Sequence, residues 1–326
     1  MLIDVHNHFY PPEYLDALRS GDSAVTLTTD REGNPVVHYP GDYNVAVLGH
    51  RDIAYRSTVL EHEGVDTQVI TLTTPGTHVE TPARAVRLAR LVNDAFAAIV
   101  RERGPRFAAL ATLPLCDPAA SVAELRRAME TLGMRGAMVF SNVNGTPLAD
   151  PRFEPLWAEA DRLGAIIHIH PTNPIDVDAM QQYWLMPLVG FLFDTTLAAA
   201  HLVFAGVPER HPRISWVLSH LGGAIPYLAE RLDRGWRCFE DSRADVSRLP
   251  SEYLRTFYYD TVNFDPVAVR LAVDFAGADR VLAASDYPHQ IGSIPLMKES
   301  LASLSVSAVE RAKILGGNAA RLYGLA

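Results

Sequence analysis

Two histidines lie two residues apart near the start of the chain, in the segment His6-Asn7-His8. The short, mostly apolar run before them predicts a β-strand. Because side chains at positions i and i+2 of a strand share a face, His6 and His8 should point the same way. Burying two imidazoles on one face is costly without a partner, and neutral imidazole is a good ligand for zinc and similar metals. We therefore interpret the pair as part of a metal site, and two hydrogen-bonded core histidines are the alternative.

Three other short apolar runs also end in residues that bind metals or transfer protons. His168 and His170 close one run, directly before a proline, His220 closes a second, and Asp286 closes a third. Packing alone does not readily explain such residues at four strand ends, whereas a single histidine elsewhere is more often structural. The histidines that we assign to packing or to the surface are His38, His50, His62, His78, His201 and His211.

The elements that must position these residues follow a regular alternation of short apolar runs and helical stretches. This alternation predicts a parallel sheet covered by helices. A closed barrel is favoured over an open sheet, because an open nucleotide-binding sheet would be expected to carry a glycine-rich loop after its first strand. The predicted strands are 2–5, 67–72, 107–113, 136–140, 165–170, 214–220, 257–261 and 280–286, and the clearest helices are 81–103, 118–132, 151–163, 188–207, 223–236, 266–277 and 307–323.

The predicted fold is therefore α/β, a (β/α)₈ TIM barrel that occupies residues 1–326 as a single domain. Barrels of this type reach this length, and no repeat or linker interrupts the chain. Residues 20–50 depart from the rhythm, since they are polar, carry Gly and Pro, and alternate Val with Thr. They predict a small β-ribbon insertion after the first strand. Insertions at the carboxyl ends of barrel strands commonly shape the active site.

Composition excludes several classes of function. The net charge is −9 and no basic stripe is visible, so nucleic-acid binding is disfavoured. Two distant cysteines, Cys116 and Cys238, make neither a disulfide framework nor a zinc–cysteine site. The chain shows no signal-peptide pattern, and the most apolar stretch, 189–207, is interrupted by polar residues such as Asp194. We expect a cytoplasmic protein that acts on a small molecule, without a membrane partner.

The combination of strand-end residues resembles the amidohydrolase superfamily, in particular its branch of aminocarboxymuconate semialdehyde decarboxylase and related non-oxidative decarboxylases. The matching segments are IDVHNHFYPPEYLDAL, GVDTQVITL, TPLADPRFEPLWAEADRLG, HIHP, HPRISWVLSHLGG, ADRVLAASDYPH and GNAARLYGL, which extend from the first residues to the last. The resemblance implies that His6, His8, His170 and Asp286 hold a metal, that His220 is the catalytic acid/base, and that Asp286 also orients a metal-bound water. His170 is preferred to His168 because the family pattern places the ligand directly before proline.

Lysine usage limits the number of metals. Binuclear members of this superfamily bridge two metals with a carboxylated lysine at the end of the fourth strand, here 136–140. The chain has only Lys298 and Lys313, both near the C-terminus. A lysine-bridged pair and a Schiff-base lysine on a central strand are thus excluded, and one divalent cation is expected. Zinc is the first choice and manganese the second, because three imidazoles and one carboxylate suit both.

The resemblance implies a metal-dependent non-oxidative decarboxylase of an aromatic or conjugated unsaturated carboxylic acid. The same residues could instead direct metal hydroxide at a carbonyl, so a hydrolase or hydratase acting on an amide, lactone or carbon–carbon bond is the alternative. A non-catalytic ligand binder on a decayed barrel is the third possibility, and the presence of all five site residues disfavours it. A homodimer is implied by the resemblance alone.

Aromatic residues near the site are candidates for substrate contacts. Phe9 and Tyr10 follow the first two histidines, and Trp184 lies beyond the fifth strand, so they could form walls for a flat substrate, ordinary packing being the alternative. Arg51 is the candidate partner of a substrate carboxylate. In the aminocarboxymuconate enzyme two arginines bind a carboxylate, and the corresponding positions fall here near Asn44 and Phe239. An acid of the salicylate type, or a ring-cleavage product, is therefore as consistent with the sequence.

Overall fold

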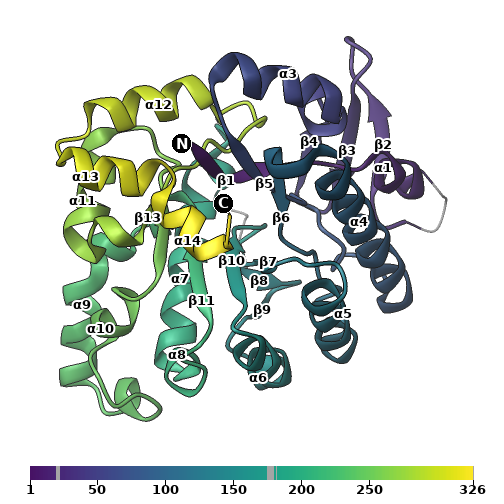
Figure 1. Cartoon of the computed structure of the whole chain (residues 1–326). Helices are drawn as coiled ribbons and strands as arrows, with labels where there is room; N and C mark the ends of the chain where they lie inside the picture. Colours follow the sequence, from purple (N-terminus) through teal and green to yellow (C-terminus); the bar gives the residue numbers. More distant parts are fainter. Residues whose placement is uncertain (20–22, 175–179, 181, 326) are drawn as a thin grey trace.

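The computed structural model describes residues 1–19, 23–174, 180 and 182–325. Strands and helices alternate along this part of the chain, with the strands inside and the helices around them (Figure 1). The strands that pair in parallel are β1 (Ile3–His8), β5 (Thr67–Thr71), β6 (Phe107–Ala109), β7 (Gly136–Phe140), β10 (Ile166–His170), β11 (Ser215–Leu218), β12 (Tyr258–Asp260) and β13 (Val281–Leu282).

These strands join into a continuous ring. One sheet has the order β1-β5-β6 and the other the order β13-β12-β11-β10-β7. A parallel bridge between Ala111 and Ala137 links β6 to β7, and another between Asn7 and Tyr287 links β1 to the segment after β13. The predicted α/β class and parallel sheet are confirmed, and the arrangement is consistent with a (β/α)₈ barrel.

Helices cover the outside of the ring and begin with recognisable signals. Asp117 and Asp265 accept hydrogen bonds from the first turns of α5 and α11, and a proline follows each of them. The longer helices are α1 (Pro12–Leu18), α3 (Ile53–Glu63), α4 (Pro82–Arg103), α5 (Pro118–Glu130), α6 (Glu154–Leu163), α7 (Phe191–Phe204), α9 (Ile225–Cys238), α11 (Pro266–Ala276) and α12 (Ile294–Ser303). Shorter helices are α2 (Leu48–Arg51), α8 (Val207–Arg210), α10 (Pro250–Leu254), α13 (Ala308–Ala312) and α14 (Asn318–Tyr323).

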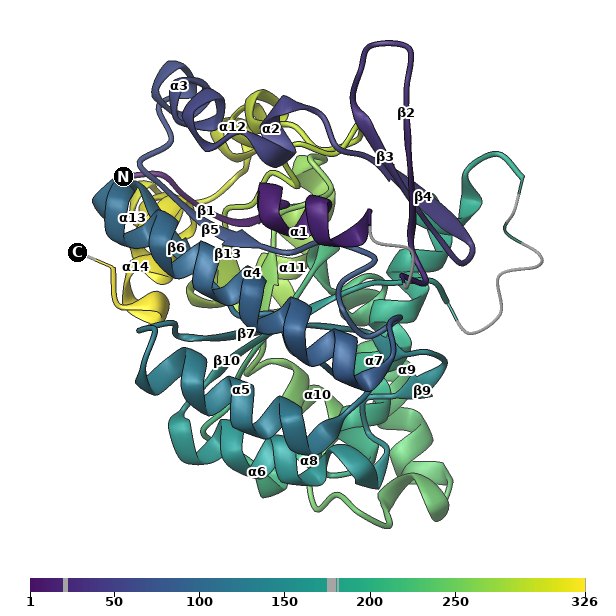
Figure 2. The ribbon, with the colours of Figure 1, turned by 90° about the vertical axis from the view of Figure 1, so that its right-hand side faces the viewer.

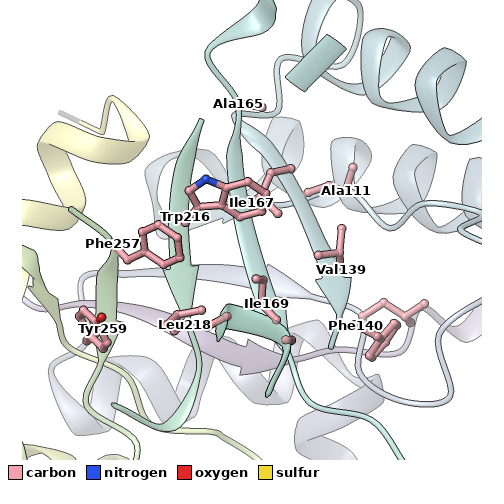
Figure 3. Close-up of a cluster of buried hydrophobic side chains, with 14 of the residues drawn as sticks. Ala111, Val139, Phe140, Ala165, Ile167, Ile169, Trp216, Leu218, Phe257 and Tyr259 are labelled. Atoms are coloured by element: carbon pink, nitrogen blue, oxygen red, sulfur yellow. The ribbon is translucent and has the colours of Figure 1, made fainter. Parts of the chain in front are cut away.

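Successive side chains of the strands point alternately outward, toward the surrounding helices, and inward, toward the interior of the ring. Figure 3 shows Ile167 and Ile169 of β10 packed with Trp216 and Leu218 of β11 in one buried cluster. Alternate residues of a strand face opposite sides, so His168 and His170 face the interior of the ring. A second apolar cluster draws on strands all around the ring and so fills its interior; it includes Ile3, Val5, Val69, Leu110, Ile166, Val217, Tyr258, Leu282, Ala284, Ala319 and Tyr323.

A bulge in β1 changes which of its residues face inward. Asp4 pairs with Gln68 and Asn7 pairs with Ile70, so β1 carries one extra residue between these pairs. Val5 belongs to the interior apolar cluster, whereas the imidazoles of His6 and His8 meet one residue further along. The bulge therefore lets the strand supply first apolar packing and then two adjacent polar side chains.

A small antiparallel sheet lies beside the carboxyl ends of the strands. It consists of β2 (Thr26–Thr29), β3 (Pro35–Tyr39) and β4 (Asp42–Val45), and it stands at the end of the molecule opposite the termini (Figure 2). The ring of Tyr43 lies 5.6 Å from that of Trp184, in the segment after β10. Residues 20–22, at the start of the predicted ribbon, lie outside the described residues.

One helical stretch, Met186–Phe204, is long enough and apolar enough to cross a membrane, judged by length and composition alone. It combines a π-helical turn, Met186–Gly190, with α7 and has 19 residues. Asp194 on this stretch is buried and accepts hydrogen bonds from Ser141 Oγ and Asn142 Nδ2, both at the end of β7. These hydrogen bonds show that the side of the helix that carries Asp194 packs against the end of β7.

Candidate active site

The imidazoles of His6 and His8 meet the carboxylate of Asp286 inside the ring. His6 Nε2 lies 3.1 Å from His8 Nε2 and 3.4 Å from Asp286 Oδ1, and His8 Nε2 lies 3.1 Å from the same oxygen. Ligand atoms that share one cation at about 2.1 Å are separated by roughly 3.0–3.4 Å in octahedral or tetrahedral geometry. The three atoms therefore have the spacing of ligands around a single ion.

His170 and His220 complete the group. The His170 ring lies 5.0 Å from that of His6 and 4.7 Å from that of His8, measured between centroids, and the His220 ring lies 5.1 Å from that of His6. Ligand atoms of His6, His170, His220 and Asp286 all fall within 4.8 Å of one another. The five side chains that the sequence singled out are thus brought together, each at most 8% exposed.

The protonation states suit a cation. Burial lowers the pKa of His8 and of His170 well below the ordinary value, which keeps these imidazoles neutral and able to bind a metal. Burial by itself would raise the pKa of Asp286, but hydrogen bonds from His220 and His8 outweigh it and lower that pKa well below its usual value. Burial would also lower the pKa of His6, but the carboxylate of Asp260 outweighs it and raises that pKa. Neutral imidazoles at His8 and His170 beside the ionised Asp286 form a donor set that a divalent cation fits, and binding of the cation would displace any proton on His6 Nε2.

Asp260, at the end of β12, holds two of these histidines and was missed by the sequence analysis. Its Oδ2 accepts a hydrogen bond from His6 Nδ1 at 2.6 Å, and its Oδ1 accepts one from the backbone N–H of His220 at 2.8 Å. Burial would raise its pKa, but the neighbouring His6 and the hydrogen bonds lower it, so the carboxylate is ionised. A carboxylate on Nδ1 fixes the His6 tautomer with Nε2 free for the metal.

The backbone is unusual at two of the predicted site residues. His220 has φ 55° and Asp286 has φ 56°, in the left-handed region that residues with a Cβ rarely adopt. Such conformations cost of order 1–3 kcal/mol each and persist only where the surroundings impose them. Here Gly222 and Gly223 follow His220, and Gly292 packs against the backbone of Asp286 at a place where a Cβ would clash. The sharp turns aim both side chains into the ring.

A cavity of about 590 Å³ opens over this group. Its size suits a single-ring ligand. Polar residues on its wall are Asp42, Asn44, His50, Thr73, Thr74, His170, His220, Asn263, Asp286, His289 and Gln290. Aromatic and apolar residues are Tyr43, Val45, Val47, Tyr183, Trp184, Pro187, Leu188, Phe191, Leu192, Val262, Phe264, Pro288 and Ile291.

Of the four residues predicted to contact substrate, only Trp184 lines this cavity. Phe9 is 1% exposed and packs 5.4 Å from the Arg56 guanidinium. Tyr10 is fully buried, and its hydroxyl donates to the Thr74 carbonyl. Arg51 donates from Nε to the Ala46 carbonyl at 2.9 Å. The structure corrects the prediction for these three side chains, because each is occupied by packing or by backbone contacts.

Two histidines on the cavity wall were not predicted as site residues. The sequence analysis assigned His50 to packing or to the surface and gave no role to His289. His50 follows no predicted strand end, whereas His289 comes three residues after the predicted strand 280–286, and this position was the signal that could have found it. Their rings lie 5.0 Å apart, and the His289 ring lies 4.7 Å from that of His8. His168, by contrast, lies behind the site with its Nε2 3.2 Å from Ser219 Oγ, as expected for a core residue.

No Lys or Arg occurs among the described residues that line the cavity. Asn44, near which the resemblance places one carboxylate-binding arginine, uses its amide nitrogen for Thr74, at 3.0 Å to the carbonyl and 2.9 Å to Oγ1. Phe239, near the other expected position, is 65% exposed at the end of α9. Arg56 is buried outside the cavity lining and donates to the carbonyls of His8 and Gly49. It therefore stabilises the backbone that carries the cavity wall.

The amidohydrolase family model matches residues 3–325, and the chain belongs to this family. It is 35% identical over 82% of its length to 2-amino-3-carboxymuconate-6-semialdehyde decarboxylase of Dictyostelium discoideum, covering 75% of that protein. The crystal structure of 5-carboxyvanillate decarboxylase from Sphingomonas paucimobilis matches with a TM-score of 0.87 and 28% identity, over 100% of this chain and 99% of the other. The predicted resemblance to the decarboxylase branch is confirmed.

A third relative provides information on the metal. Dihydroxybenzoic acid decarboxylase of Polaromonas sp. JS666 matches with a TM-score of 0.83 and 26% identity, over 99% of this chain and 97% of that one. Its structure contains manganese and the inhibitor 2-nitroresorcinol. The metal found in this relative is the second of the two that the sequence analysis considered.

Proposed function

We propose that this chain is a metal-dependent carboxy-lyase that removes CO₂ from an aromatic or conjugated unsaturated acid without an oxidant. The observation that carries the proposal is its likeness, over nearly the whole chain, to relatives that are named as decarboxylases. The buried histidine and aspartate group beside an aromatic-walled cavity supports it, because that arrangement provides both a cation site and a proton donor.

One divalent cation would be held by His6, His8, His170 and Asp286. These residues suit zinc and manganese alike, and the manganese of the Polaromonas relative favours manganese as the first ion to test. When bound, the cation supplies positive charge that attracts and polarises substrate oxygens at the base of the cavity. Absence of a strand-borne lysine continues to support one ion rather than two.

His220 is the proposed proton donor. It lines the cavity, and its Nε2 lies 3.8 Å from Asp286 Oδ2, so it stands beside the proposed cation site within reach of a bound substrate. The proton passes from His220 to the carbon that bears the carboxylate. The carbon–carbon bond to the carboxylate then breaks, its electron pair returns to the substrate, and CO₂ leaves. Asp286 acts both as a ligand and as the orienting carboxylate for this transfer.

The cavity wall favours an acid with a single carboxylate. The described lining residues include Asp42 and Asp286 but no Lys or Arg, so a second carboxylate would find no cationic side chain there. Acids of the salicylate type meet this condition. The wall is partly built by β4, and we propose that β2–β4 is an insertion that closes the cavity over a single-domain barrel.

Turnover with isotopes separates the lyase from the hydrolase alternative. Metal-loaded protein is incubated with a panel of hydroxybenzoic and muconic acids, and CO₂ is measured against loss of substrate. In D₂O the product should carry one deuterium at the carbon that lost the carboxylate. Incorporation of ¹⁸O from labelled water into a product carboxylate, without CO₂, would instead assign the chain to the hydrolases. The expected cytoplasmic location and the homodimer remain proposals, the latter to be measured by light scattering.

A further inference from the structure

We propose that His50 and His289 form a hydroxyl-recognition subsite that selects acids with a second hydroxyl group beside the carboxylate. The inference rests on the proposed function and names residues that would determine its specificity. It concerns the part of the cavity wall formed by α2 and by the segment after β13, next to the cation site.

The two imidazoles form one face of the wall. Both residues line the cavity, and their ring centroids are 5.0 Å apart at an interplanar angle of 60°. The His289 ring also contacts that of His8, at 4.7 Å. The pair therefore adjoins the cation site, where a substituent next to a bound carboxylate could contact it.

His50 lacks any protein partner that would explain it. Its side chain is buried, with the residue 1% exposed, yet neither Nδ1 nor Nε2 has a hydrogen-bond partner within the described part of the chain. Buried polar atoms are nearly always paired, and leaving them unpaired is costly. An imidazole on a cavity wall with both nitrogens open is an arrangement that a ligand group can satisfy.

The fold holds this pair in place without a ligand. A Cβ at Gly49 would collide with the side chains of Tyr287 and Pro288, so α2 can pack directly against the segment that carries His289. The Gly49 carbonyl accepts hydrogen bonds from Arg56 Nε at 2.9 Å and Nη2 at 2.8 Å. On the other side, His289 Nε2 lies 3.1 Å from Thr73 Oγ1. The subsite is therefore preorganised.

The chemistry of the wall fits a hydroxyl rather than a second carboxylate. An imidazole offers one donor and one acceptor, and a hydroxyl can both donate and accept. The amide nitrogen of Asn44, which also lines the cavity, donates to Thr74, so the group that Asn44 could still offer a ligand is its oxygen, an acceptor. A hydroxyl can donate to such an oxygen, whereas a carboxylate would be repelled by it.

The test compares two ligands that differ by one hydroxyl. Binding of 2-nitroresorcinol and of 2-nitrophenol to the manganese-loaded protein is measured by calorimetry, so turnover is not needed. The unmodified protein should prefer the diol. His50→Phe should reduce that preference by roughly tenfold or more, because the second hydroxyl loses its partner. His50→Asn, which keeps a donor and an acceptor, should retain part of it, and His289→Phe should weaken it independently.

His78→Phe is the matched control, since His78 is also a buried histidine with an open Nδ1 but does not line the cavity. Metal content and thermal unfolding confirm that each variant is folded and loaded. Equal weakening of both ligands, or no change, in His50→Phe and His289→Phe would overturn the subsite. If no acid is decarboxylated while the diol preference still depends on His50, the proposed reaction fails and the subsite stands. If acids are decarboxylated and the preference survives both variants, the subsite fails.

Discussion

At the scale of single residues, His220 should separate proton transfer from metal binding. In His220→Asn the cation should remain, because His6, His8, His170 and Asp286 are untouched, while turnover should fall by roughly 10²–10⁴-fold. Elemental analysis and the initial rate measure the two effects. Loss of the metal from this variant would make His220 a ligand, which its place within 4.8 Å of the other ligand atoms allows geometrically.

Asp260 should increase the metal affinity of the cation site without binding the ion itself. Asp260→Asn keeps the shape but removes the charge opposite His6 Nδ1, so metal affinity should fall roughly 10–100-fold. Activity should recover at saturating metal, which distinguishes positioning from catalysis. Asp194→Asn is the control, since Asp194 is also a buried aspartate but bonds Ser141 and Asn142 instead. Equal losses of metal affinity in the two variants would contradict the role of Asp260.

The predicted site residues that the structure brings together share a position rather than a type. His6, His8, His170, His220 and Asp286 all follow apolar runs, and parallel strands in a ring bring their carboxyl ends together. Asp260 also follows such a run, but its role depends on a 2.6 Å contact with a residue 254 positions away. Arg51 was the candidate partner of a substrate carboxylate, and it donates to the Ala46 carbonyl instead. Distances of that kind arise from packing, which a single sequence does not reveal.

At the scale of elements, the junction between α2 and the segment after β13 should be intolerant of added volume. Gly49→Ala would place a methyl group against Tyr287 and Pro288, so we expect a loss of about 1–3 kcal/mol in unfolding free energy. Thermal or denaturant unfolding measures it. Gly235→Ala on α9 is the control, because its new Cβ meets only Phe239 at 3.8 Å and should stabilise the helix by up to about 1 kcal/mol. A neutral Gly49→Ala would show that the junction adapts.

Elements with strong periodicity were predicted well, and local breaks were not. The helices at 118–132 and 266–277 correspond to α5 and α11 within two residues at each end. The predicted helix 307–323 divides into α13, a π-helical turn and α14. The turn ends at Gly316 and Gly317, and a Cβ at Gly316 would clash with the Met1 backbone. A contact with the first residue decides this break, so hydropathy alone did not mark it.

At the scale of the whole molecule, removal of the cation should destabilise the fold. Three imidazoles and a carboxylate are buried together inside the ring, and a bound ion stabilises the folded state according to its concentration relative to Kd. At a hundredfold excess over Kd the gain is about 2.7 kcal/mol. A chelator should therefore lower the unfolding temperature, and manganese should restore it. His6→Ala should show no such response, and an unchanged melting curve after verified metal removal would contradict the assignment.

The parallel α/β fold could be predicted because its signal repeats along the chain. Eight apolar runs alternate with helical stretches, so errors at single boundaries do not alter the class. The position of β2–β4 at the cavity, and the contact between Tyr43 and Trp184, depend on how two surface segments meet. Such contacts follow no period in the sequence.

Closure of the ring between β1 and the segment after β13 has a consequence for biosynthesis. His8 and Asp286 are 278 residues apart, yet they would share one ion. A ribosome that has released His6 and His8 from its exit tunnel must translate most of the remaining chain before their partner carboxylate emerges. A nascent chain thus carries two exposed histidines but no complete cation site. Under the proposed assignment, metal loading would follow translation, and an ion bound at this position would mark a chain whose ring of strands has closed.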